Sequence, residues 1–197
     1  RINRYDNISS LDPTFARTQA NNWVCNLMYN GLVKLNDSLN VAPDIAKSWT
    51  ISEDGRIYTF TLRNDVYFHK NKVFHDDSTR IVVASDFTYS FDRLTDTKVG
   101  GAGSWVLNNV DKYSAINDTT FIIQLKEAFP PFLGLLSMKY CSVVPHEMFK
   151  NGQEEFRKNP IGTGPFQFKM WEDNIKLVFR KNPLYFEKDD KGNQLPY

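Results

Sequence analysis

The feature that most constrains the fold is a run of alternating apolar and polar residues beside a tight turn. Large apolar side chains alternate with polar ones along residues 57–63, so a strand there would bury one face and expose the other. A second strand-like stretch, 48–52, precedes it. The Asp54–Gly55 step between them favours a hairpin turn, because glycine adopts positive φ without steric cost. The sequence therefore predicts a β-hairpin, and it predicts that residues 66–69 extend the same sheet.

The rest of the chain carries further signals for both helices and strands. Apolar residues at helical spacing predict helices, and short apolar runs between turn residues predict strands. We expect helices at 19–29, 84–94, 132–136 and from 145, and strands at 32–35, within 113–125, and in a hairpin over 166–180. Ser85 or Asp86 can cap the helix at 84–94. Because strands and helices do not alternate regularly, we expect an α+β fold.

Length and charge exclude several classes of protein. The chain has 197 residues, which is enough for one large domain or two small ones. Its 24 basic and 23 acidic residues leave a net charge of +1, so no positive field exists to hold nucleic acid or an anionic membrane. Apolar runs such as 81–84 are far shorter than the ~20 residues that span a bilayer.

The sequence shows no motif for catalysis, a cofactor or a metal. It has neither a GxSxG elbow nor a phosphate-binding loop, and the glycine-rich stretch 100–104 follows a predicted helix rather than a strand. We therefore expect a surface loop there. His69, His75, Asp76 and Asp77 fit no metal-ligand spacing, so we expect them to be solvated loop residues. We expect no cofactor and no enzymatic activity.

The two cysteines and the aromatic residues leave more than one interpretation open. Cys25 and Cys141 do not form a CxxC pair; they could bridge in an oxidising compartment, but we expect two separate buried thiols. Aromatic residues make up 14% of the chain, more than a small core needs. For most of them we expect core packing. Trp105 is the exception, because it directly follows the glycine-rich loop rather than an apolar stripe.

Several motifs occur in an order that resembles one family. They are Leu11-Asp12-Pro13, the stretch 27–33 (LMYNGLV), 43–49 (PDIAKSW), 51–69 with its hairpin, 84–93 (ASDFTYSFDR), 159–166 (NPIGTGPF) and 182–186 (NPLYF). Together they resemble the extracytoplasmic solute-binding proteins of peptide and nickel ABC importers, the dipeptide/oligopeptide-binding family (family 5). Relatives have a shorter turn where residues 70–80 lie, and we expect a longer surface loop here.

The resemblance implies a periplasmic-binding-protein-like fold of type II. On that pattern, residues 1–40 and 161–197 would be part of the sheet domain of a first lobe, and residues 41–160 would be an inserted α+β domain. The second, C-terminal lobe would lie outside these 197 residues. Gly162 to Gly164 would let the chain cross tightly back into the first lobe.

The resemblance also implies a function. We expect the substrate-binding component of an ABC importer, which captures oligopeptides or a related small solute outside the cytoplasmic membrane and delivers it to the transmembrane subunits of the permease. The protein would be a monomer, either periplasmic or lipid-anchored at the outer face of the membrane. A nickel-chelate, heme or sugar receptor of the same family is the alternative. A hydrolase or transferase lacks a visible nucleophile–base pair, and a domain that docks a membrane sensor stays open.

Three segments would face the solute if the resemblance holds. The expected ligand-binding residues are Ile8, Ser9, Ser10, Leu11, Trp105, Met138, Lys139 and Tyr140. The early loop would offer backbone groups to an extended ligand, the tryptophan would lie over it, and Lys139 could pair with a carboxylate. Since a closed cleft buries a ligand between two walls, this chain alone should bind its solute weakly or not at all.

Overall fold

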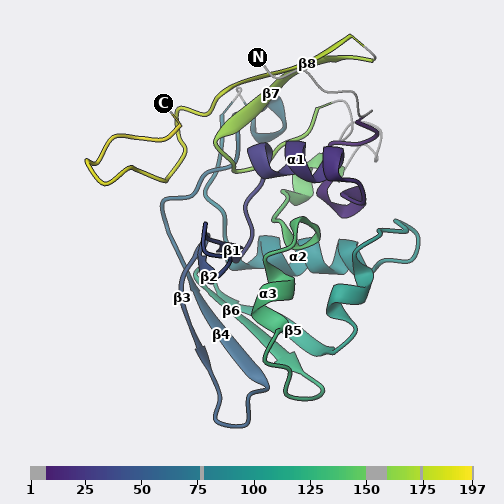
Figure 1. The fold of residues 1–197 in the computed structure, drawn as a ribbon, viewed down its shortest axis with the longest axis vertical. Helices are drawn as coiled ribbons and strands as arrows, with labels where there is room; N and C mark the ends of the chain where they lie inside the picture. Colours follow the sequence, from purple (N-terminus) through teal and green to yellow (C-terminus); the bar gives the residue numbers. More distant parts are fainter. Residues whose placement is uncertain (1–7, 76–77, 150–158, 174, 197) are drawn as a thin grey trace.

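The computed structural model describes residues 8–75, 78–149, 159–173 and 175–196, and it has the expected mixture of helices and sheets. Its largest sheet is antiparallel, with four strands in the order β3-β4-β6-β5. These strands are β3 (Ala46–Ile51), β4 (Ile57–Leu62), β5 (Val110–Asn117) and β6 (Thr120–Leu125). Figure 1 shows this sheet at one end of the molecule.

The predicted hairpin is present as β3 and β4. Trp49 pairs with Phe60 in its register, and Tyr58 and Phe60 are buried while the threonines beside them are partly exposed. The turn contains Gly55 at φ +69°, a conformation that side chains with a Cβ rarely adopt. Alternation along β4 therefore decides which face of the sheet meets the core.

Helix α2 (Ala84–Thr95) covers the inner face of this sheet. Its buried Phe87 and Phe91 lie with their ring centroids 5.8 and 5.6 Å from that of Phe121 on β6. Three packed aromatic rings bury a large apolar area at low cost in rotamer freedom. The predicted helix at 84–94 is thus confirmed to within one residue.

The predicted cap of α2 is wrong in detail. Neither Ser85 nor Asp86 precedes the helix, since both lie in its first turn and Val83 is the residue before it. Asp86 instead accepts a hydrogen bond of 2.9 Å from the Val83 backbone N–H. A carboxylate in this position satisfies one free N–H at the helix start and interacts favourably with the helix dipole.

The remaining elements are short and lie mostly at the opposite end of the molecule or between the two ends (Figure 1). They are η1 (Pro13–Phe15), α1 (Gln19–Met28), β1 (Val33–Leu35), β2 (Val41–Pro43), η2 (Lys72–Phe74), η3 (Ser104–Leu107), α3 (Phe132–Leu136), η4 (Lys139–Cys141), η5 (His146–Phe149), β7 (Phe166–Glu172) and β8 (Lys176–Lys181). Strands β1 and β2 pair with each other, as do β7 and β8. The hairpin β7–β8 lies beside α1.

Residues 66–69 do not extend the four-stranded sheet, so that prediction is wrong. Tyr67 forms one isolated bridge with Ile81, outside the named strands. Phe68 is fully buried, and its N–H donates to the Arg80 carbonyl at 3.1 Å. The segment is extended as a strand would be, but its partner is the loop before α2.

His69 is buried rather than solvated, which corrects a second expectation. Its Nε2 lies 2.9 Å from the Gly164 carbonyl, and its Nδ1 accepts from the Gly162 N–H at 3.3 Å. This pattern requires the neutral ring with the proton on Nε2, and burial lowers the pKa of His69 to about 4. His75 is exposed as expected, and Asp76 and Asp77 lie outside the described residues.

One hydrophobic core runs through the described parts of the chain. It includes Met28 from α1, Phe60 from the sheet, and Ile161 and Tyr185 from the last quarter of the sequence. Asn30 adds polar links, since its carbonyl accepts from the Val143 N–H at 3.0 Å and its side chain bonds the Thr163 hydroxyl at 3.0 Å. The division at residues 41 and 160 stays a prediction, and the core is continuous across it.

The two cysteines are unbridged thiols, and both are buried. Burial raises the pKa of Cys25, with a further contribution from the charge of Asp12, and burial raises that of Cys141; each is about 12, against an ordinary value of 9.0. At mildly alkaline pH the thiolate fraction should therefore be ~1000-fold below that of an exposed thiol.

We expect Ellman's reagent to modify neither cysteine in the native chain and both in concentrated guanidinium chloride. Rapid native reaction of either thiol would contradict this burial.

Candidate functional site

Residues that adjoin the three segments expected to face a solute meet in the structure. The carbonyl of Thr14 in η1 accepts a hydrogen bond of 3.1 Å from the N–H of Ala102 in the glycine-rich loop. The next glycine, Gly103, lies against the ring of Tyr140 so closely that a Cβ there would come within 2.1 Å of the ring carbon Cγ. Only glycine permits that approach. The early loop, the glycine-rich loop and η4 therefore form one continuous junction.

Trp105 lies next to this junction, at the start of η3, and 47% of its surface is exposed. A large aromatic side chain with this exposure departs from the usual burial of tryptophan. Ser9 is also exposed, whereas Ile8, Ser10, Met138 and Tyr140 are partly buried. We call the exposed parts of 8–10, Trp105 and Tyr140 the candidate surface.

Leu11 does not belong to the candidate surface by its side chain. It is fully buried, and its carbonyl accepts a hydrogen bond of 2.8 Å from the Tyr29 hydroxyl. Its role is to fasten the early loop to the core. Ligand contact by each of the eight predicted residues, including the backbone of Leu11, stays a prediction.

The early loop is held by a residue that the sequence analysis missed. Asn21 accepts from the Ser9 N–H at 3.1 Å and donates to the Ser9 hydroxyl at 2.9 Å and to the Phe15 carbonyl at 3.3 Å. Thr18 caps α1 by accepting from the Asn21 N–H at 3.1 Å. The signal available in the sequence was an asparagine in the first turn of a predicted helix.

Lys139 lies in a separate hollow of about 320 Å³, which no other predicted ligand residue lines. The hollow is lined by Asn26, Tyr29, Asn30, Lys34, Leu35, Asp44, Ser137, Lys139, Pro165 and Tyr185. The Lys139 ammonium donates to the Tyr29 carbonyl at 3.3 Å. Burial lowers the pKa of Lys139, and the charge of Asp44 opposes that shift. Burial likewise raises the pKa of Asp44, whose carboxylate accepts from Asn30 at 2.8 Å.

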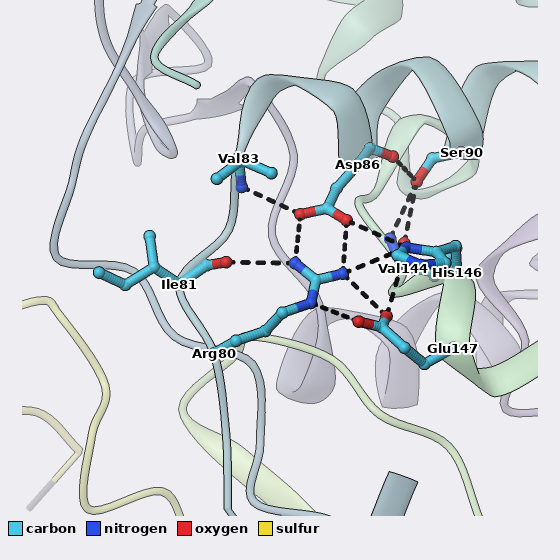
Figure 2. A network of polar contacts seen from close by, with 8 residues as sticks. All are labelled: Arg80, Ile81, Val83, Asp86, Ser90, Val144, His146 and Glu147. Atoms are coloured by element: carbon cyan, nitrogen blue, oxygen red, sulfur yellow. Dashed lines mark hydrogen bonds and ion pairs between the residues drawn. The ribbon is translucent and has the colours of Figure 1, made fainter. Parts of the chain in front are cut away.

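A polar network around Arg80 fixes the loop before α2 (Figure 2). The Arg80 guanidinium bonds both carboxylate oxygens of Asp86 at 2.7 Å, and it reaches Glu147 of η5 at 2.6 and 2.8 Å. Its guanidinium also lies 4.9 Å from the ring centroid of Phe68. Burial alone would raise the pKa of Glu147, but the hydrogen bonds from Arg80 hold it below its ordinary value. This network lies between the long 70–80 loop and η5.

The described residues offer few other chemical options. Among them, no group of three or more His, Cys, Asp or Glu side chains could hold a metal ion. In the same residues, no helix is long and apolar enough to cross a membrane. The described residues instead include an exposed aromatic ring, Trp105, and an exposed hydroxyl residue, Ser9, side chains that suit non-covalent binding of a small solute.

Comparison with known proteins supplies the decisive observation. The family model for bacterial extracellular solute-binding proteins, family 5 (middle), matches residues 40–197. The chain belongs to this family. The family resemblance inferred from the motifs is thereby confirmed.

Individual family-5 relatives agree with this assignment. The dipeptide-binding protein of Escherichia coli K12 is 34% identical over 170 residues, which cover 78% of this chain and 31% of the relative. The periplasmic binding protein DppA of Helicobacter pylori, solved with the peptide STSA, has a TM-score of 0.83 at 30% identity, covering 92% of this chain and 38% of its own. NikZ of Campylobacter jejuni, solved with Ni(L-His), has a TM-score of 0.80 at 27% identity. The match covers 93% of this chain and 35% of the NikZ chain.

These likenesses confirm the family-5 periplasmic-binding-protein fold that the motifs implied. The chain spans about a third of the length of the curated relatives that it matches. What those relatives bind therefore concerns a protein about three times as long.

Proposed function

We propose that this chain forms one wall of a solute receptor that serves an ABC importer outside the cytoplasmic membrane. The observation that carries the proposal is the junction where the loop that leads to the exposed Trp105 hydrogen-bonds to Thr14, at the end of an early loop fastened by Asn21. Family membership supports a role in capture rather than in chemical conversion. The second wall would come from a lobe outside residues 1–197, in keeping with the greater length of the relatives.

The solute class that fits this wall best is a short peptide. An extended peptide presents backbone N–H and carbonyl groups that can pair with a loop such as 8–10, and an aromatic ring can cover its side chains. DppA of H. pylori, similar to this chain, was solved with a peptide. NikZ, solved with Ni(L-His), makes a metal chelate the alternative solute.

The proposal includes a location and partners. The protein would act in the periplasm or from a lipid anchor at the outer face of the cytoplasmic membrane, as a monomer, and would pass its solute to the transmembrane subunits of a permease.

Mass spectrometry of small molecules that co-purify with the protein expressed in its complete form tests the solute class. Peptides support the proposal, a nickel chelate supports the alternative, and a covalent adduct on the protein contradicts a transport receptor.

A single wall should bind weakly, because it leaves about half of the ligand surface in water. We expect isothermal titration of the 197-residue chain with tri-alanine to show no micromolar binding. Millimolar binding should still appear by NMR, as shifts of the Trp105 indole N–H and of the amides of 8–10. Micromolar or tighter affinity would contradict the role of one wall in a two-walled cleft.

Removing the exposed ring should weaken this residual binding. The change Trp105→Ala should raise the dissociation constant of tri-alanine about tenfold, because an aromatic contact of this size contributes roughly 1.4 kcal/mol. The matched control is Ile116→Ala on β5, another exposed apolar residue, at 59%. Equal affinity of both variants and the unmodified chain would remove Trp105 from the binding surface.

A further inference from the structure

The candidate surface is built from irregular segments that are far apart in the sequence. Residues 8–15 and the glycine-rich loop at 100–104 contain no strand and no α-helix among their described residues. Segments of this kind open locally at low free energy unless buried side chains fasten them. The structure places one such fastening at the C-terminal end of α2.

Arg93 reaches from the last turn of α2 into the early loop. Only 5% of its surface is exposed, and its guanidinium donates to both carboxylate oxygens of Asp12, at 3.0 Å to Oδ1 and closer to Oδ2. It also donates to the Thr14 hydroxyl. Its carbon Cζ lies 4.4 Å from the ring centroid of Phe149. Because the guanidinium is planar, the paired hydrogen bonds fix the orientation of the loop as well as its position.

The contact continues from Asp12 to the loop that carries Trp105. Asp12 Oδ1 accepts from the Thr14 N–H at 3.0 Å, and the Thr14 carbonyl accepts from the Ala102 N–H at 3.1 Å. Gly101 lies so close that a Cβ there would come within 2.3 Å of the Thr14 methyl group. From Ala102 the chain needs only three residues to reach Trp105.

We infer that Arg93, paired with Asp12, is a positioning residue for solute binding, because it holds the early loop and the Trp105 loop in a fixed position relative to each other. The inference deepens the proposed function and rests on it for the identity of the candidate surface. Stability alone does not account for the pair, since replacing a buried ion pair by apolar residues is often neutral or stabilising. The pair gives the junction a defined geometry that an apolar contact would not impose.

The test compares two arginines that both bond aspartates buried in the fold. In Arg93→Lys the ammonium cannot form the paired bonds to Asp12 while reaching Thr14, whereas the charge is kept. Hydrogen exchange by NMR on the 197-residue chain should then accelerate about tenfold at the Thr14 and Ala102 amides, with little change at the Ile123 amide in the sheet. The affinity for tri-alanine should fall about tenfold with it, because the Trp105 ring loses its fixed place.

The control is Arg80→Lys, which disturbs the network of Figure 2 at the other end of α2. It should leave exchange at Thr14 and Ala102, and the affinity, unchanged. If Arg93→Lys does not fold, Asp12→Asn decides the question, because asparagine still accepts from the Thr14 N–H but offers no charge to Arg93.

The outcomes separate the two claims. Local acceleration at Thr14 and Ala102, together with weaker binding of tri-alanine, supports the positioning role, whereas unchanged affinity in a chain that binds tri-alanine overturns its link to solute binding. Acceleration that is equal at Thr14, Ala102 and Ile123, or none at all, overturns it and leaves Arg93 a general stabilising residue. If the unmodified chain shows no shift with tri-alanine even though exchange responds as expected, the peptide proposal fails while the positioning of the two loops stands.

Discussion

The substitution Gly162→Ala is expected to lower the free energy of unfolding by about 3–5 kcal/mol. A Cβ on this residue would come within 1.9 Å of the Met28 carbonyl oxygen and 2.7 Å of a ring carbon of Tyr29. The first of these atoms is backbone at the end of α1, and the second belongs to a fully buried side chain, so neither can move away cheaply. The chain must shift where it crosses back over α1.

Urea denaturation followed by circular dichroism would measure this loss. The matched control is Gly134→Ala in α3, where nothing beyond the neighbouring residues and the helix's own backbone lies within 4 Å of the added Cβ. Alanine in a helix should raise stability there by about 0.5–1 kcal/mol. Equal effects of the two substitutions would mean that the crossing at Gly162 is looser than the structure shows.

Acidification should destabilise the chain through His69. The buried ring stays neutral in the folded state, with a pKa of about 4, whereas the unfolded chain takes up a proton near the ordinary value of 6.5. Between these two values the unfolded state binds more protons than the native state, so stability falls as the pH falls from 6.5 to 4. The two pKa values imply a loss of roughly 3 kcal/mol from this residue.

The physical reason is burial of the ring, which also accepts a hydrogen bond at Nδ1. Protonation of that nitrogen removes the acceptor for the Gly162 N–H and places a charge in the core. The variant His69→Gln keeps one donor and one acceptor but does not titrate, so its stability should fall less over the same pH range, by about 3 kcal/mol. Thermal unfolding of both chains at a series of pH values gives the comparison. Parallel curves for the two chains, or an NMR titration that places the His69 pKa near 6.5, would contradict the burial of the ring.

Periodicity in the sequence predicted the regular elements well. The alternation at 57–63 and the helical spacing at 84–94 were read correctly because each reflects one buried face of one element, here Phe60 on β4 and Phe91 on α2. Residues 66–69 form a comparable apolar run but pair with the loop before α2 instead of joining the sheet. The sequence pattern reports burial, whereas the strand partner depends on tertiary contacts.

The candidate surface was predictable in part. Trp105 stood out because it follows glycines rather than an apolar stripe, and it is exposed. The contacts that assemble the surface could not be predicted from the sequence. Asp12 and Arg93 are separated by 81 residues, and neither motif contains a signal that points to the other. Lys139 turned out to line a hollow of its own, since the short η4 directs Lys139 and Tyr140 to different neighbours.

The crossing at residues 162–164 also bears on the order in which the chain can fold during synthesis. Thr163 bonds Asn30 across 133 residues, and Gly164 bonds His69 across 95 residues. Until that late segment leaves the ribosome, the groups at 28–30 and 69 lack their native partners, and the apolar side chains around them stay open to wrong association. The first third of the chain therefore cannot complete its native contacts until its last fifth is available.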